Sequence, residues 1–180
     1  MSNDFPHPFS DLSRNYRRFR RELPAIVSNM AVNEFKTAFT TGGLRGEPRW
    51  KPRRKARNGR DASRAILVKT GRLKRSLRPM PTYDYARVVT NVPYAEAHNE
   101  GFKGTVTVKG HRRHKYKTTK VKKAGAKRST TMKERTSYTM VKTHRRKMNL
   151  PARPFMKTTK PLLDDIDKYV LDKLDQIFSK

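Results

Sequence analysis

The 180-residue chain contains no cysteine, and this absence removes several kinds of chemistry at once. Disulfide bonds, thiolate metal sites and cysteine nucleophiles are all excluded, as is typical of a protein that assembles in a reducing cytoplasm. The first residues lack the basic and apolar regions of a signal peptide. No apolar run approaches the roughly 20 residues that a membrane helix needs. We therefore expect a soluble protein that is made in the cytosol.

Acidic residues are also scarce. Asp and Glu number 15 against 44 Lys and Arg, and the formal net charge is +29. Such an excess disfavours compaction unless anions or partner subunits screen it, and basic surfaces bind phosphates without sequence preference. Nucleic acid is therefore the first partner that the composition indicates. An anionic membrane is a weaker candidate, because no stretch combines a large apolar face with the basic clusters.

The two ends of the chain carry the strongest helical patterns. A first helix is predicted over residues 10–22, and Pro24 is expected in the first turn of a second helix that ends at Gly42-Gly43. Pro161 is expected to open a last helix, whose apolar stripe consists of Leu163, Ile166, Val170, Leu174 and Ile177.

Between these helices the patterns are shorter. Residues 44–60 form a basic loop in which Trp50 is, apart from Leu44 at its start, the only large apolar residue, so we expect Trp50 to pack onto the core. A helical stretch is predicted over 61–71, a strand over 85–90, and a short helical turn over 94–100.

A basic arm follows. Residues 103–147 contain 17 Lys or Arg and one acid, Glu134. Strands are predicted at 105–108 and 137–143, the second returning antiparallel to the first. The segment between them, 111–135, has hardly any apolar residue and is expected to be a mobile arm or a long hairpin ordered by a partner.

These patterns predict an α+β fold. We expect a small antiparallel β-sheet packed against long N-terminal and C-terminal helices, with a basic extended arm or hairpin. The predicted organisation is an N-terminal extension, 1–23, followed by one domain, 24–180, that includes the basic arm 103–148.

Candidate catalytic groups are few. Asp164 and Asp165 diverge by about 100° on a helix, and the helix dipole explains acids near the start of the last helix. His111 and His114 have a spacing seen in zinc sites, yet no Cys or acid lies close by to complete a ligand set. His98 could be a general base, but a structural histidine in a tight turn is the simpler interpretation. We expect no catalytic residue, no metal site and no cofactor.

The basic segments are better explained by binding. Segments 45–78 and 103–147 carry more positive charge than solubility requires. Contact with phosphates or with an acidic protein surface is therefore expected. Sequence-specific recognition of bases is not expected, because the chain has no zinc finger and no clear recognition helix. The candidate DNA- or partner-contacting residues are Arg112, Arg113, Lys115, Lys117, Lys120, Lys122, Lys123, Lys127, Arg128, Arg145 and Arg146.

Three short motifs occur in a fixed order. The first is Thr70-Gly71-Arg72-Leu73 with Ser76 and Leu77, and the second is Val92-Pro93-Tyr94-Ala95 followed by His98 and Gly101. The third is Leu150-Pro151-Ala152-Arg153-Pro154-Phe155. Together they resemble the tail-completion or virion-morphogenesis proteins of tailed phages, which include minor tail and head–tail joining components.

The expected role of these motif residues is structural. Gly71 permits a turn between two helical pieces, and Tyr94 and His98, four residues apart, share one face of a helical turn. Phe155 should anchor an extended connection to the core, and Arg153 can pair with an acid or with a neighbouring subunit. The full set is Thr70, Gly71, Leu73, Ser76, Tyr94, Ala95, His98, Gly101, Pro151, Ala152, Arg153, Pro154 and Phe155.

The resemblance implies a structural protein of the virion neck and not an enzyme. Such a protein would form a homo-oligomeric ring of six or twelve copies that joins the tail to the portal side of the head and lines or surrounds the DNA channel. Its expected partners are portal or adaptor proteins, tail-tube proteins and packaged double-stranded DNA. The basic arm is longer than the family pattern, so whether it contacts DNA or protein stays open.

Two alternatives remain at this point. A ribosomal or nucleoid-type nucleic-acid-binding protein would have a similar composition, but this interpretation leaves the three motifs unexplained. An enzyme is the third possibility, with a cell-wall hydrolase or a nuclease as the types that an assay should test.

Overall fold

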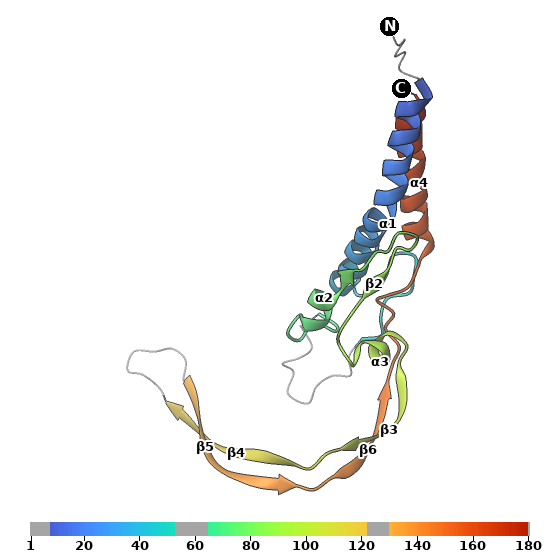
Figure 1. The fold of residues 1–180 in the computed structure, drawn as a ribbon. Coiled ribbons are helices and arrows are strands. Elements are labelled where there is room, and N and C mark those ends of the chain that lie inside the picture. The colour runs from blue at the N-terminus through green and yellow to red at the C-terminus, as the bar shows by residue number, and fades with distance from the viewer. Residues whose placement is uncertain (1–7, 53–64, 122–129, 180) are drawn as a thin grey trace. The chain divides into compact units, whose positions relative to one another are not determined.

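The computed structural model describes residues 8–52, 65–121 and 130–179 (Figure 1). The chain divides into two compact units. The helical unit comprises Met1–Phe102 and Leu150–Lys180, and the hairpin unit comprises Lys103–Asn149. Helices and small antiparallel sheets occur together, so the predicted α+β class is confirmed.

Helix α1, Pro8–Thr41, is one continuous helix of 34 residues. The prediction that Pro24 separates two helices was wrong. Phe19 before the proline and Val32 after it are both buried, so packing on both sides outweighs the backbone hydrogen bond that proline cannot make. The hydroxyl of Ser28 donates to the carbonyl of Pro24 at 2.7 Å and is fully buried.

Helix α4, Lys160–Phe178, packs beside α1 (Figure 1). Its predicted apolar stripe needs one correction. Leu163 is 46% exposed, whereas its neighbour Leu162 is buried in the core together with half-buried Ile166. Leu162 and Ile166 are four residues apart and share a helix face, so α4 turns this face, and not that of Leu163, toward the core.

The hydrophobic core gathers side chains from distant parts of the sequence. The indole N–H of Trp50 donates to the carbonyl of Pro154 at 2.9 Å, and its ring meets Phe39 edge-on with centroids 5.7 Å apart. The prediction that Trp50 packs onto the core is therefore confirmed. The buried cluster consists of Phe35, Ala38, Phe39, Leu44, Trp50, Leu73, Leu77, Val92, Ala95, Phe155 and Leu162.

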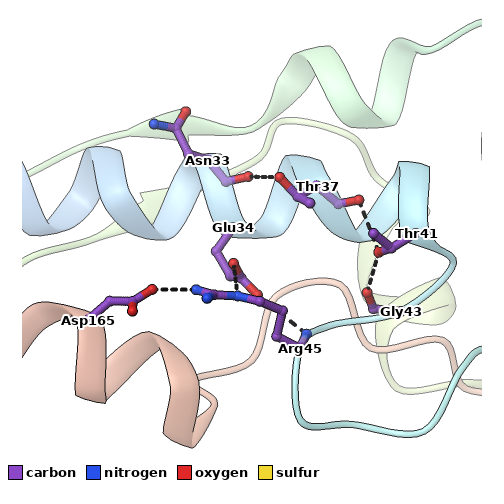
Figure 2. A network of polar contacts seen from close by, with 7 residues as sticks. All are labelled: Asn33, Glu34, Thr37, Thr41, Gly43, Arg45 and Asp165. Carbon is purple, nitrogen blue, oxygen red and sulfur yellow. Dashed lines mark hydrogen bonds and ion pairs between the residues drawn. The ribbon is translucent and has the colours of Figure 1, made fainter.

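Three charged residues connect α1, the following loop and α4 (Figure 2). The guanidinium Nε of Arg45 donates to the buried carboxylate of Glu34 at 2.8 Å, and its Nη2 donates to Asp165. These hydrogen bonds, to Asp165 first and Glu34 second, raise the pKa of Arg45 above its usual value. We call this set the ionic clamp. The first turn of α4 contains no acid, so the expectation that Asp165 serves the helix dipole is replaced by its pairing with Arg45.

The segment after the loop differs from its predicted helix. Residues 61–64 of that prediction lie outside the described part of the chain, and residues 65–71 form turns and bends. Leu67 has a positive φ of 61°, which a helix cannot contain. The helix begins only after Gly71, as α2, Arg72–Ser76.

The predicted strand over 85–90 is reduced to two residues. Strand β2, Val88–Val89, pairs antiparallel with β1, Arg78–Pro79, and this small sheet packs against α1. Pairing stays short because proline has no N–H to donate, and because the N–H of Arg87 donates to the Ser28 hydroxyl of α1. Helix α3, Ala95–Asn99, follows as predicted.

The hairpin unit is a two-stranded ribbon in two parts. Strand β3, Phe102–Val108, pairs with β6, His144–Leu150, and strand β4, His111–Val121, pairs antiparallel with β5, Thr130–Val141. The hairpin alternative for the basic arm is confirmed. The predicted pairing of 137–143 with 105–108 was wrong. Residues 137–141 belong to β5 and pair with β4, whereas β3, which contains 105–108, pairs with β6. The prediction failed because β4 and β5 extend the ribbon beyond the two short strands that the sequence indicated. Exposed polar strands lack the apolar alternation that would reveal their length.

No helix in the described ranges is both long enough and apolar enough to cross a membrane.

Candidate functional site

The three motifs meet at one open pocket of about 360 Å³ in the helical unit. Each motif contributes lining residues, and the segment 66–69, which precedes the first motif, contributes the remainder. We call this the motif pocket. Its lining consists of Ile66, Leu67, Lys69, Thr70, Gly71, Arg72, Leu73, Tyr94, His98 and Arg153.

The first motif forms one wall of the motif pocket and anchors it. Gly71 has a φ of 71° at the start of α2. The predicted turn between two helical pieces was wrong in one respect, because the described residues before Gly71, 65–70, form no helix. Leu73 and Leu77 are buried in the core. The Ser76 hydroxyl lies 2.6 Å from the hydroxyl of Thr90 and donates to the carbonyl of Leu73 at 2.8 Å, which ties α2 to the end of β2.

The second motif places two rings at the pocket. The Tyr94 ring meets the His98 ring edge-on, with centroids 5.8 Å apart, so the predicted shared face is confirmed. Ala95 is buried beneath them. Gly101 ends this segment with a φ of 86°, and a Cβ there would lie 2.9 Å from the backbone nitrogen of Ala152. Only glycine allows the second and third motifs to approach so closely.

The third motif crosses the second. The backbone N–H of Arg153 donates to the carbonyl of His98 at 2.9 Å, and its Nη2 donates to the carbonyl of Lys51 at 3.2 Å. Phe155 is fully buried against Phe39, with ring centroids 5.2 Å apart, so its predicted anchoring role is confirmed. Pairing of Arg153 with an acid or a neighbouring subunit stays a prediction.

Asn99 is a residue that the sequence patterns did not single out. Its Oδ1 accepts hydrogen bonds from the backbone N–H groups of Phe155 and Met156, both at 3.0 Å. Its position at the end of α3, just before Glu100-Gly101, was the available signal, because Asn side chains there often bond nearby backbone. Asn99 therefore joins the second motif to the third.

The environment of His98 in the motif pocket disfavours the charged form of its ring. Burial, followed by the nearby charge of Arg153, lowers the pKa of His98 below its usual 6.5. Among the described residues, the Nδ1 of His98 has no hydrogen-bond partner. The described residues also bring no three potential metal ligands together.

Local strain and charge mark the rim of the motif pocket. The positive φ of Leu67 costs roughly 1–2 kcal/mol for a non-glycine residue and is held in place at the pocket edge. Lys69 and Arg72 add exposed positive charge beside it. The sequence patterns placed Lys69 and Arg72 in the basic segment 45–78 but did not relate them to Tyr94 and Arg153, because only the folded chain brings these residues to one pocket.

The candidate contact residues of the basic arm belong to the hairpin unit. Arg112, Arg113, Lys115 and Lys117 lie on β4 with exposed side chains, and Lys120 belongs to the same strand. Arg145 and Arg146 are exposed on β6. Four further candidates lie outside the described residues: Lys122, Lys123, Lys127 and Arg128.

Comparison with known protein families gives one clear result. Residues 9–175 match the phage virion morphogenesis family, so nearly the whole chain is covered. The chain belongs to this family, and its role is structural, in the assembly of phage particles. The resemblance predicted from the three motifs is thereby confirmed. Comparisons with curated proteins and with solved structures give no significant match.

Proposed function

We propose that the protein completes the phage tail at the neck, as a homo-oligomeric ring of six or twelve copies without catalytic activity. The ring joins the tail to the portal side of the head and surrounds the DNA channel, with portal or adaptor proteins and tail-tube proteins as neighbours. In this proposal residues 24–180 form the tail-completion-like domain, which includes the basic arm 103–148, and residues 1–23 are an N-terminal extension.

One observation carries this proposal beyond family membership. Large apolar side chains remain exposed on the two terminal helices: Phe9 and Tyr16 on α1, and Leu171 and Phe178 on α4. Phe9 is 77% exposed, and Leu171 and Phe178 are each 61% exposed. Exposed apolar surface of this kind is covered at the interfaces between the subunits of an assembly.

The motif pocket supports the same proposal. The three motifs hold a rigid, concave surface together with buried leucine, phenylalanine and alanine side chains, and its rim carries exposed Lys69 and Arg72. Such a surface suits contact with an acidic or polar segment of a neighbouring protein.

Two measurements test the proposal directly. Mass spectrometry of purified virions should detect the chain, and electron microscopy of the purified protein should show closed rings. The central channel should be wide enough for a duplex, roughly 20 Å on the scale of DNA grooves. A protein that stays monomeric at every concentration and is missing from virions would disprove the proposal.

A role of these exposed apolar side chains in subunit contacts can be tested by substitution. Leu171→Glu should reduce oligomer formation in native mass spectrometry, because a charge would then be buried at a subunit interface. Gln176→Glu is a matched control that introduces the same side chain at an exposed polar position of the same helix. Equal oligomer formation by both variants would show that Leu171 lies in no subunit interface.

A further inference from the structure

The hairpin unit cannot be explained by its own packing. Every described side chain of β4 is exposed, and β5 is exposed except at Val141. A two-stranded ribbon without a covered face is marginally stable in water. From Lys103 to Lys147 the sequence has 17 basic residues and one acid, so the two strands also repel each other. The unit therefore needs an anionic partner.

The register of β4 and β5 divides the ribbon into two different faces. Directly paired residues of an antiparallel ribbon point to the same side. His114 pairs with Tyr138, and Tyr116 pairs with Arg135 beyond a bulge that follows Lys115. These pairs, with their alternate neighbours, define what we call the aromatic–basic face: Arg112, His114, Tyr116, Lys133, Arg135 and Tyr138.

A direct contact confirms this division. The guanidinium carbon of Arg112 lies 5.1 Å from the centroid of the Tyr138 ring, so the two side chains share one face. This cation–π contact holds an otherwise mobile arginine in position. Less side-chain entropy is then lost when the guanidinium binds a ligand.

The opposite face has a weaker positive field. It carries Arg113, Lys115 and Lys117, but Lys117 is paired directly across the strands with Glu134. Three basic residues therefore share this face with the single acid of the segment. Among the residues whose side chains the structure describes, the aromatic–basic face has three basic residues, Arg112, Lys133 and Arg135, and no acid. The register places Lys120, the partner of Thr131, on the same face.

The spacing of the charges matches a DNA groove. Arg112 and Tyr116, the partner of Arg135, are four positions apart on β4, which is roughly 13 Å along a strand. The major groove of B-DNA is about 12 Å wide and admits a two-stranded ribbon. Arg112 and Arg135 are thus spaced to reach phosphates on both sides of one groove.

From these observations we infer that the aromatic–basic face binds the phosphate backbone of double-stranded DNA. The choice of a duplex rests on the proposed function, in which the ring surrounds the genome. A second copy of the hairpin does not fit the same face, because two surfaces of equal positive charge repel. Binding requires no base recognition and depends steeply on salt.

The experiment uses the full chain and a 25-base-pair fluorescent duplex of mixed sequence, with binding followed by anisotropy at several NaCl concentrations. The test variant combines Arg112→Gln, Lys133→Gln and Arg135→Gln. The matched control combines Arg113→Gln, Lys115→Gln and Lys117→Gln, and it removes the same charge from the opposite face. Trp50 fluorescence and far-ultraviolet circular dichroism verify folding.

Loss of three phosphate contacts should reduce the slope of log K against log salt by about 2.7, since each contact contributes roughly 0.9. The control triple should change this slope by less than about 1. A further variant, Arg112→Lys with Arg135→Lys, keeps the charge and should keep the slope. Equal losses in both triples, or a larger loss in the control, would overturn the inference.

Virion assembly separates this inference from the proposed function. If the test triple binds DNA like the wild type but fails to enter virions, the face contacts a protein partner and the DNA inference is wrong. If the wild type is absent from virions while the test triple shows the expected loss of slope, the neck function is wrong and the DNA-binding face remains.

Discussion

Replacing Arg45 by methionine should destabilise the helical unit more than any other single change in the ionic clamp. Methionine keeps much of the apolar stem and removes the guanidinium. The Glu34 side chain is only 8% exposed, so its carboxylate loses a charge-assisted hydrogen bond where water cannot readily replace it. The backbone N–H of Arg45, 3.3 Å from Glu34, remains as a partner.

The magnitude follows from these environments. A hydrogen bond to a charged group contributes about 1.5–3 kcal/mol. The second contact, to Asp165, is half-exposed on both sides, and such pairs contribute about 0.2–1 kcal/mol. We therefore expect Arg45→Met to lower the free energy of unfolding by about 2–3 kcal/mol. Asp165→Asn should lower it by less than about 1 kcal/mol.

Urea unfolding followed by tryptophan fluorescence is the suitable assay. Trp50 is the only tryptophan, and it is buried in the core of the helical unit, so its emission reports on that unit alone. The double variant Glu34→Met with Arg45→Met should lose about 1 kcal/mol less than the sum of the single losses, because no unpaired carboxylate remains. Equal losses of unfolding free energy for Arg45→Met and Asp165→Asn would refute the reasoning, since the burial of Glu34 would then add nothing to the strength of its contact with Arg45.

Three further predictions concern the motifs. Gly101→Ala should destabilise the protein by about 1–3 kcal/mol, since its Cβ would press on backbone atoms 2.9–3.0 Å away. Gly42→Ala is the control: its φ is similar, but a Cβ there would meet no atom within 4 Å, so it should destabilise clearly less. Thermal unfolding of the two variants compares these losses. Phe155→Ala should cost about 3–5 kcal/mol in the urea assay, because Phe155 is fully buried, and a loss below 1 kcal/mol would contradict this packing. His98 binds its proton more weakly in the folded state than its usual pKa of 6.5, so stability should be constant above this pH and decrease as the pH falls below it. His98→Gln should flatten that decrease in melting temperatures measured from pH 5 to pH 8, and an unchanged profile would assign the pH dependence to other groups.

The sequence by itself determined the class of the protein and the place of its anchors. The α+β class, the terminal helices and the core positions of Trp50 and Phe155 follow from apolar patterning, which marks side chains that must leave water. The order of the three motifs also led to the phage virion morphogenesis family, as the match over residues 9–175 shows.

Tertiary structure decided the features that depend on contacts between distant segments. Pro24 stays within one helix because α1 is packed before and after it, and Leu162 replaces Leu163 in the core because of the way α4 faces α1. The length of β4 and β5 was hidden, since an exposed ribbon imposes no apolar period.

In the candidate sites, too, the sequence determined which residues take part, and the tertiary structure decided which of them lie together. Motif residues such as His98 and Arg153 could be selected from their order in the chain, but their meeting at one pocket requires the folded backbone. The basic residues of the arm could be counted, whereas their separation into two faces depends on strand register. Register fixes which side chains share a face, because a shift of one residue would exchange the two faces.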